Sequence, residues 1–234
     1  MTAGQKERLK KWGIPAGCAL LAIGILWSYL ALFSTTFHIQ ETVYLYIDTD
    51  DTADSVKTKI QETGRPGISS GFSFLSALGG YTVKTGRYAI SPDDYMLRLF
   101  RRLRQERQSP VRLVLPSVRT MERLAGTLGR KLMLDSATVA QSLADSAFCR
   151  QYGYDTATIA CLFIPNTYEI YWDTALEDFM ERMQKEHDAF WSEERLGKAQ
   201  AAGLTPDEVA TLASIVDEET VNNAEKPMVA GMYI

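Results

Sequence analysis

The stretch Leu212-Ala213-Ser214-Ile215-Val216-Asp217-Glu218-Glu219-Thr220 stands near the C-terminal end of this 234-residue chain. A helix is predicted here, because Thr205-Pro206-Asp207-Glu208 combines an N-cap threonine, a proline at the first helical position and a glutamate three residues after the cap. Apolar or small residues then recur at helical spacing, namely Val209, Leu212, Ala213, Val216 and Thr220. The pattern predicts a helix that packs one face on a core and ends near Asn222.

Glu219 is the candidate catalytic acid of this helix. At about 100° per residue, it falls on the flank of the apolar face, beside Leu212 and Ile215, whereas Glu218 points to the opposite, solvent side. Partial burial and the negative C-terminal end of the helix dipole would both disfavour a charged carboxylate, as a general acid requires. The alternative, which the spacing alone favours, is a border glutamate that only solvates the helix end.

The N-terminal end is predicted to be a membrane anchor over residues 12–37. No Asp, Glu, Lys or Arg occurs from Trp12 to Gln40, and the 20 residues from Ile14 to Phe33 are almost wholly apolar. This length is sufficient for a helix to cross a bilayer core of about 30 Å. The alternative is a cleaved signal peptide, but the apolar run is too long for one and Ala31-Leu32-Phe33 is a poor cleavage site.

The charges before the apolar run predict its orientation. Residues 1–11 contain four basic residues and a single acid, Glu7; the basic ones are Lys6, Arg8, Lys10 and Lys11. Basic flanks favour the cytoplasmic side. We therefore expect a cytoplasmic tail over residues 1–11 and a single-pass inner (plasma) membrane protein whose bulk, after Phe37, lies in the periplasm or cell exterior.

Composition excludes several classes of function. The 25 basic and 29 acidic residues give a net charge of −4, so a nucleic-acid partner is not expected. The sequence has no CxxC or HExxH motif, and its two histidines stand alone, so neither a metal site nor a cofactor is expected. Cys149 and Cys161 could form a disulfide bridge in an oxidising compartment or remain two free thiols, and both alternatives stay open.

Residues 41–108 are predicted to form a small α+β module. A β-rich run over 42–47 ends in the acidic turn Asp48-Thr49-Asp50-Asp51, which lacks the glycine and final glutamate of a calcium loop and is better interpreted as a solvated turn that caps a helix over 52–63. Helical stretches over 72–78 and 93–106 flank a strand over 86–90. The last of these helices turns most of its arginines outward, as a solvated face.

Residues 109–234 are predicted to form a mixed, mostly helical second domain. A strand over 111–115 precedes helices over 120–132, 136–148 and 175–197. Between the last two helices, an apolar run leads into Pro165-Asn166-Thr167-Tyr168 and two further aromatic residues, Tyr171 and Trp172. Aromatic rings stack on the apolar faces of sugars, so these three rings fit a glycan-binding groove; core packing is the alternative.

Four stretches in order resemble the YceG-like (MltG) endolytic murein transglycosylases. They are the N-terminal anchor, Gly86-Arg87-Tyr88 after a strand, Pro165-Asn166-Thr167-Tyr168, and Ala213-Ser214-Ile215-Val216 through Thr220 into the final Glu225–Ile234 segment. The resemblance spans essentially the whole chain. One departure is Asp217-Glu218 where the family has Glu-Lys, which would add negative charge beside Glu219.

The resemblance implies a membrane-anchored lytic transglycosylase that cleaves nascent peptidoglycan glycan strands between MurNAc and GlcNAc, forms 1,6-anhydroMurNAc and limits strand elongation. Glu219 would be the catalytic acid, and residues 41–108 would be the LysM-like module of the family. Substrate binding would fall to Tyr168, Tyr171, Trp172, Thr220 and Glu225. Glycan strands, the membrane and peptidoglycan synthases are the implied partners.

The chain stops at Gly231-Met232-Tyr233-Ile234, whereas members of the family continue well beyond this point. We therefore expect the catalytic domain over 109–234 to be incomplete at its C-terminus and weak or inactive alone. The alternative function is a non-catalytic, membrane-tethered module that binds peptidoglycan or serves as a scaffold.

Overall fold

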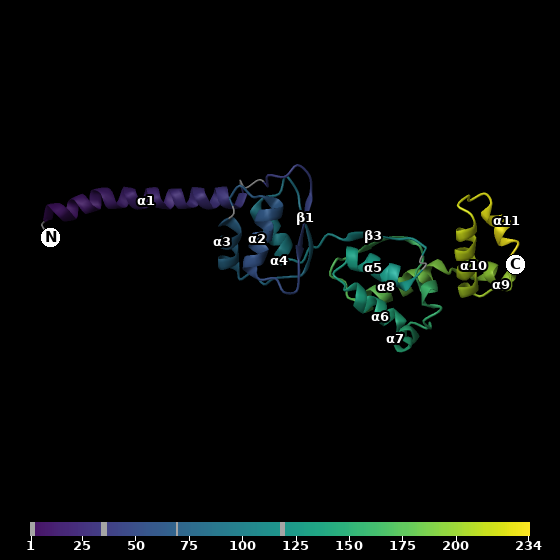
Figure 1. The fold of residues 1–234 in the computed structure, drawn as a ribbon. Helices are drawn as coiled ribbons and strands as arrows, with labels where there is room; N and C mark the ends of the chain where they lie inside the picture. Colours follow the sequence, from purple (N-terminus) through teal and green to yellow (C-terminus); the bar gives the residue numbers. More distant parts are fainter. Residues whose placement is uncertain (1–2, 34–36, 69, 118–119) are drawn as a thin grey trace. The chain divides into compact units, whose positions relative to one another are not determined.

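The computed structural model describes residues 3–33, 37–68, 70–117 and 120–234, with side chains described from residue 17 onward. The fold is mixed α+β and mostly helical, as predicted (Figure 1). The chain divides into two compact units, Met1–Ser109 and Pro110–Ile234. Each unit has a hydrophobic core of its own.

Helix α1 (Ala3–Phe33) begins the first unit. None of the helices in the described part of the chain is both long enough and apolar enough to cross a membrane. Residues 34–36 of the predicted anchor, and the side chains up to residue 16, lie outside the described residues. At its C-terminal end α1 packs on the rest of the unit, because Ala31 is fully buried and the Phe33 ring lies 5.8 Å from that of Tyr95.

A two-stranded antiparallel sheet and three helices form the rest of the first unit. Strand β1 (Val43–Ile47) pairs with β2 (Gly86–Ile90), with Leu45 opposite Tyr88. Helices α2 (Ala53–Gly64), α3 (Ser70–Gly79) and α4 (Met96–Arg104) complete this unit. The core is drawn from all these elements: Leu45, Ile47, Val56, Ile60, Phe72, Tyr88, Ile90, Met96, Leu99 and Leu103 are each no more than 2% exposed.

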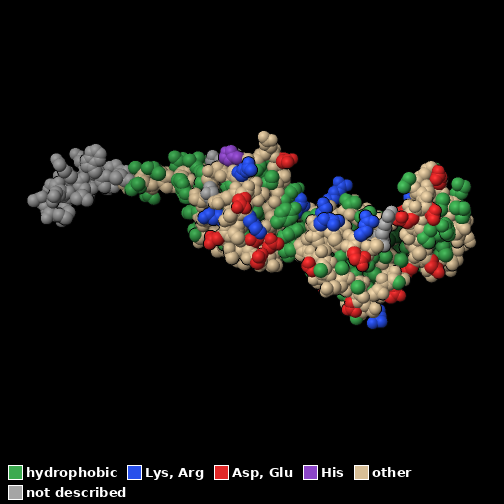
Figure 2. Space-filling model, viewed as in Figure 1, with side chains coloured by type: hydrophobic (Ala, Val, Ile, Leu, Met, Phe, Trp, Pro, Cys, Tyr) green, Lys and Arg blue, Asp and Glu red, His purple; other side chains and the backbone are tan. Residues whose placement is uncertain are grey.

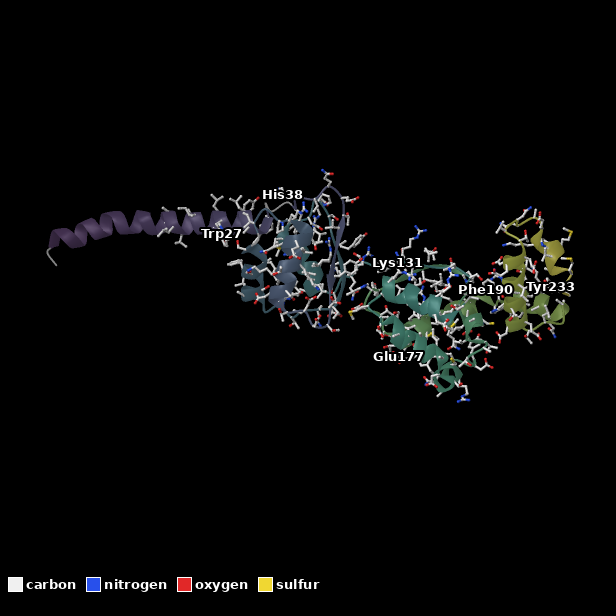
Figure 3. All side chains as sticks on the ribbon, in the orientation of Figure 1. Trp27, His38, Lys131, Glu177, Phe190 and Tyr233 are labelled. Atoms are coloured by element: carbon white, nitrogen blue, oxygen red, sulfur yellow. The ribbon has the colours of Figure 1, made fainter. Side chains whose placement is uncertain are left out.

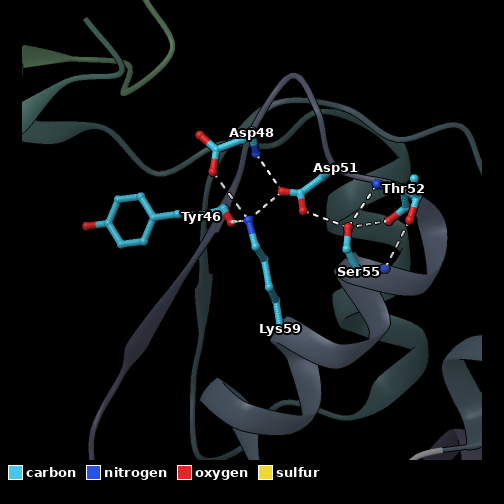
Figure 4. A network of polar contacts seen from close by, with 6 residues as sticks. All are labelled: Tyr46, Asp48, Asp51, Thr52, Ser55 and Lys59. Carbon is cyan, nitrogen blue, oxygen red and sulfur yellow. Dashed lines mark hydrogen bonds and ion pairs between the residues drawn. The ribbon is translucent and has the colours of Figure 1, made fainter. Parts of the chain in front are cut away.

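The acidic turn before α2 caps that helix, as predicted. Thr52 is the N-cap and forms a capping box with Ser55 (Figure 4). Asp51 accepts hydrogen bonds from the Ser55 hydroxyl at 2.6 Å and from the Asp48 N–H at 2.7 Å, and it pairs with Lys59. Burial alone would raise the pKa of Asp51, but the bonds from Lys59 and Ser55 outweigh it and lower that pKa.

Helix α4 corrects one expectation about its arginines. Its apolar residues Met96, Leu99, Phe100 and Leu103 are buried as predicted. Arg102, however, does not point into solvent: it donates to both carboxylate oxygens of Asp94, at 2.7 and 3.2 Å, and to the carbonyl of Ala89. Asp94 is 1% exposed, and a buried carboxylate needs a charged partner, so one arginine of the row is drawn inward.

The second unit also contains a two-stranded antiparallel sheet. Strand β3 (Val111–Leu115) pairs with β4 (Asn166–Ile170), which places Val111 opposite Ile170 and Leu115 opposite Asn166. Helices α5 (Met121–Lys131), α6 (Ser136–Ala144), α7 (Ser146–Gln151), the 3-10 helix η1 (Ile159–Leu162) and α8 (Leu176–Phe190) pack with this sheet around one core. Strand β4 corrects the sequence-based expectation of a turn and a cleft lining over 165–172, because Asn166–Ile170 pairs with β3.

Two of the predicted helices are each broken into two. The helix expected over 136–148 ends at Ala144, because Asp145 adopts an extended conformation and its side chain accepts from the Ala147 N–H to start α7. The helix expected over 175–197 is interrupted at Trp191 and Ser192, after which α9 (Glu193–Ala201) begins. The chain then continues into α10 (Pro206–Glu219) and α11 (Lys226–Ala230).

Candidate active site

Helix α10 begins as its sequence dictates. Thr205 is the N-cap, its hydroxyl accepts from the Glu208 N–H at 3.3 Å, and the Glu208 carboxylate accepts from the Thr205 N–H at 2.8 Å. The bonds that the Glu208 carboxylate accepts from the backbone N–H and the hydroxyl of Thr205 lower the pKa of Glu208. The helix ends at Glu219, with Thr220 in an extended conformation as the C-cap, three residues before the predicted end.

Glu219 is exposed, which corrects the expectation of a partly buried acid. Only Val216 of this helix is buried, at 5% exposure, and Ile215 beside Glu219 is 38% exposed. Glu219 lies in the last helical turn, as predicted, and its Oε1 accepts a hydrogen bond of 3.4 Å from the hydroxyl of Tyr233, a residue labelled in Figure 3. The carboxylate is therefore accessible, and a tyrosine from the following segment contacts it.

A polar network closes the loop that follows Glu219. The Thr220 hydroxyl donates to Glu225 Oε2 at 2.9 Å, and the Asn222 side-chain amide donates to Glu225 Oε1 at 2.9 Å. The Asn222 N–H in turn donates to the Thr220 hydroxyl oxygen at 3.1 Å. The structure thus brings together three of the predicted site residues, Glu219, Thr220 and Glu225, in the turn between α10 and α11.

The extra negative charge expected from Asp217 is compensated. Lys226, at the start of α11, places its Nζ 2.6 Å from Asp217 Oδ1. This ion pair and the Thr220–Glu225 hydrogen bond both join the end of α10 to the start of α11. Because Asp217 precedes Glu219 and Thr220 follows it, the two interactions hold the backbone on either side of Glu219.

A cavity of about 970 Å³ lies beside this turn within the second unit. One wall comes from the end of β3 and from α5 and includes two arginines and one acid; its polar residues on α5 are Glu122, Arg123, Thr127 and Arg130. The other comes from the end of α10 and the following turn, with Asp217, Glu218, Thr220, Val221 and Lys226. Glu218, expected to face solvent away from the site, therefore lines the cavity, while Glu219 stands between two residues that line it.

The basic wall was not anticipated from the sequence. Arg123, Thr127 and Arg130 follow at intervals of four and three along α5, so they share one helix face. Arg130 donates to the Thr127 hydroxyl at 3.1 Å. Figure 2 shows Lys and Arg side chains on the surface of this unit, and acidic ones among the side chains of its C-terminal helices. The periodicity predicts a shared face, but only the fold shows which cavity that face borders.

The three aromatic candidates do not line this cavity. Nor do they line a second, mostly apolar groove, which is formed by the end of α8 together with α9, α10 and α11. Tyr168 is 3% exposed, belongs to the core and donates its hydroxyl to the Ile164 carbonyl at 2.6 Å, so its ring faces are covered. Trp172 is partly buried against the same core. Tyr171 is 54% exposed, because successive residues after β4 point to opposite sides of the chain.

The two cysteines of the second unit are free thiols. Cys149 is buried and donates to the Leu143 carbonyl at 3.3 Å, and burial raises its pKa. Cys161 is half-buried near the start of α10, with its Sγ 3.8 Å from the Asp207 carbonyl oxygen. Within the described residues, His, Cys, Asp and Glu side chains form no group of three or more that could hold a metal ion.

Comparison with known proteins identifies the class to which this arrangement belongs. Residues 45–234 match the sequence profile of the YceG-like family, and the chain belongs to that family. Among solved structures, the chain is similar to a YceG-like protein from Listeria monocytogenes, at 18% sequence identity and a TM-score of 0.48, over 80% of this chain and 67% of that one. No curated protein sequence matches.

Proposed function

We propose that this protein is a membrane-anchored lytic transglycosylase that cleaves nascent peptidoglycan glycan strands between MurNAc and GlcNAc and so limits strand elongation. The observation that carries the proposal is the position of Glu219. In a chain of the YceG-like family, this carboxylate ends α10 directly before Thr220 and is exposed, and its two neighbours in sequence, Glu218 and Thr220, line a cavity of about 970 Å³.

A single carboxylate suffices for this reaction if the substrate supplies the nucleophile. Ordinary glycosidases use two carboxylates, one as acid and one as nucleophile or base. Here Glu219 in its protonated form would donate a proton to the glycosidic oxygen as the bond to C1 of MurNAc breaks. The C6 hydroxyl oxygen of the same sugar then bonds to C1, and the Glu219 carboxylate accepts the hydroxyl proton. The product is a 1,6-anhydro ring, and no water is consumed.

Neighbouring groups support this role for Glu219. The hydroxyl of Tyr233 contacts the carboxylate, and the Thr220–Asn222–Glu225 network holds the adjacent turn. Arg123 and Arg130 give the facing cavity wall positive charge, which suits the carboxylates of peptidoglycan peptide stems. Thr220 and Glu225 then act by shaping the turn, and Tyr171 is an exposed ring available to stack on a sugar.

The anchor and the first unit form the second part of the proposal. Helix α1 would tether the protein to the inner (plasma) membrane with residues 1–11 in the cytoplasm. Residues 41–108 would act as a LysM-like module that keeps the glycan near the membrane, close to the peptidoglycan synthases that produce it. The apolar composition of residues 14–33 and the preceding basic residues support this arrangement.

The test of the catalytic assignment is Glu219→Gln in the full-length protein. Glutamine keeps the shape of the side chain and cannot donate the proton, so release of 1,6-anhydro-muropeptides from purified peptidoglycan should fall by about 10²-fold or more. Mass spectrometry of the soluble products measures this release, and circular dichroism confirms that the variant folds. Glu218→Gln tests the competing carboxylate, which lines the cavity; it should retain most activity, because the proposed proton transfer uses Glu219 alone. Equal losses in the two variants would show that the acid is wrongly assigned.

A non-catalytic, membrane-tethered module that binds peptidoglycan or serves as a scaffold is the second candidate. The observation in its favour is the sparse packing of α10, in which only Val216 is buried. Under this alternative, peptidoglycan sedimentation would retain the protein, no anhydro products would appear, and Glu219→Gln would change neither result.

A further inference from the structure

Helix α3 presents an apolar face that the core does not cover. Between Arg65 and Lys84 the sequence has no charged residue. Gly71, Phe72 and Leu75 turn inward and are buried, whereas Phe74, Ala77 and Leu78 are exposed, Leu78 by 76%. Ala77 and Leu78 lie three and four residues after Phe74, which places the three side chains in one stripe along the helix. An uncharged, exposed apolar stripe of this kind marks an interaction surface.

This stripe continues onto the apolar surface of α1. The ring of Trp27 on α1 meets the ring of Phe74 edge-on, with centroids 6.2 Å apart. The two backbones approach closely, because a Cβ placed on Gly71 would lie 2.6 Å from the Ala31 carbonyl oxygen. In Figure 1, α3 is the helix on the side of the first unit from which α1 projects, and Figure 2 shows hydrophobic side chains along α1 up to this point.

The exposed side chains of α1 indicate what covers the combined surface. Leu20, Leu21, Ile23, Ile25 and Leu26 are between 57% and 71% exposed. At about 100° per residue, these positions are distributed around the whole helix. A folded protein partner covers one face of a helix, whereas a bilayer covers all of them.

Arginines border the apolar surface. Helix α4 packs beside α3, and Arg104 Nη1 lies 3.8 Å from the position of a Cβ on Gly79, at the end of α3. Arg101 is exposed one turn earlier. Neither arginine forms an ion pair with another described residue of this unit. Apolar side chains edged by arginines are suited to the boundary between acyl chains and anionic headgroups.

We propose that the stripe Phe74–Ala77–Leu78 of α3 is a bilayer-contact surface, which lies in the headgroup layer of an anionic membrane with Arg101 and Arg104 on lipid phosphates. The inference rests on the proposed anchoring by α1 and is independent of the catalytic role of Glu219. It would hold the first unit in one orientation against the membrane, instead of leaving it on a free tether.

The test uses an environment-sensitive fluorophore on single cysteines of the full chain, reconstituted in vesicles of phosphatidylglycerol and phosphatidylethanolamine. Cys18 and Cys161 are replaced by alanine, and the buried Cys149 is retained, with the chain lacking any added cysteine as the labelling blank. Leu78→Cys is the test site. Glu62→Cys on α2 is the control in the same unit, and Leu21→Cys on α1 reports the anchor itself. Nitroxide lipids with a shallow label supply the quencher.

We expect a blue-shifted, lipid-quenched fluorophore at positions 78 and 21 and a water-exposed one at position 62. Replacing both arginines, Arg101→Gln with Arg104→Gln, should lower the equilibrium constant for contact at position 78 about thirtyfold and leave position 21 unchanged. Vesicles without phosphatidylglycerol should have the same effect.

Two outcomes would contradict the proposal. A lipid-quenched fluorophore at position 21 with a water-exposed one at position 78 would overturn the α3 surface but not the anchor. Water-exposed fluorophores at both positions would overturn the anchor. Quenching at 78 by a second labelled chain, without lipid quenching, would assign the stripe to a dimer instead.

Discussion

Asp94 is the only buried charged side chain among the residues that the structure describes. It sits between β2 and α4, where the Ser91 N–H donates to it at 2.9 Å and Arg102 at 2.7 and 3.2 Å, while Arg98 lies 3.6 Å away. Burial by itself would raise the pKa of Asp94, but the bonds from Arg102 and Ser91 outweigh it and lower that pKa. The carboxylate therefore stabilises the first unit only as long as it is ionised and Arg102 is present.

Arg102→Ala should destabilise the first unit by about 3–5 kcal/mol at neutral pH, because it leaves a buried carboxylate without its main partner. The pKa of Asp94 in the folded state lies below the unfolded value of about 3.9. Its contribution is consequently complete above about pH 4 and is lost as the pH falls through the lower, folded pKa. Urea unfolding between pH 7 and pH 3 measures both effects, and the difference between wild type and variant should shrink in acid. Arg101→Ala, an exposed neighbour, should cost less than about 0.5 kcal/mol; a similar loss in both variants would contradict the assignment.

Tyr168 and Tyr171 should separate stability from glycan binding. Tyr168→Phe removes a buried hydroxyl and leaves the Ile164 carbonyl without its donor, so it should cost about 1 kcal/mol of stability with little change in binding. Tyr171→Ala removes an exposed ring and should leave the melting temperature nearly unchanged while it weakens binding to soluble glycan fragments. Calorimetry and a peptidoglycan pull-down give the two readouts. Reduced glycan binding by Tyr168→Phe at unchanged stability would instead assign Tyr168 to the glycan-binding groove.

Among the secondary-structure elements, the starts of capped helices agree best with the sequence-based predictions, and the breaks within two predicted helices differ most from them. The capping boxes of α2 and α10 begin those helices where the sequence predicts, because the bonds lie within four residues of chain. The breaks at Asp145 and at Trp191–Ser192 were missed, since the helical periodicity of apolar residues continues through both. In each case the chain turns so that a second helix can bury its own residues.

The close contact of α1 with α3 makes a prediction for Gly71. Gly71→Ala places a methyl group against the Ala31 backbone carbonyl, which cannot move aside as a flexible side chain does. We expect a loss of about 1–3 kcal/mol and a shift of Trp27 emission as the end of α1 separates from α3. Gly24→Ala is the matched control, because a Cβ on Gly24 meets no atom within 4 Å. That control should leave the Trp27 emission unchanged and slightly favour the helix; an equal shift from both variants would show that helix propensity, not contact, is responsible.

The molecule as a whole consists of two units with separate cores, joined between Ser109 and Pro110. The first unit includes the apolar α1, and the second contains the candidate site. Packing is uneven in the second unit: α5 to α8 share a core with the β3–β4 sheet, whereas α10 and α11 bury one side chain, Val216, between them. Under the proposed function, the second unit meets its substrate on the side of the membrane opposite residues 1–11.

A fusion experiment tests that orientation. Alkaline phosphatase fused after Gln108 should be active, because the enzyme folds only outside the cytoplasm, and a fusion at Gln5 should be inactive. The physical reason is the basic segment Lys6–Lys11, which favours the cytoplasmic side. Matched expression of the two fusions, measured by immunoblot, is the control. The reverse pattern of activity would invert the topology and place Glu219 away from peptidoglycan.

Sequence alone determined the features that depend on neighbours along the chain: the capped starts of α2 and α10, and strands β1, β2 and β3. The tertiary structure decided what depends on distant residues. It placed Tyr168 in the core as a partner of Leu113 across β3–β4, drew Arg102 inward to Asp94, and set Arg123 and Arg130 of α5 across a cavity from the end of α10. It also left Glu219 exposed, because burial of a helix face requires a facing surface, and periodicity specifies the face but not what covers it.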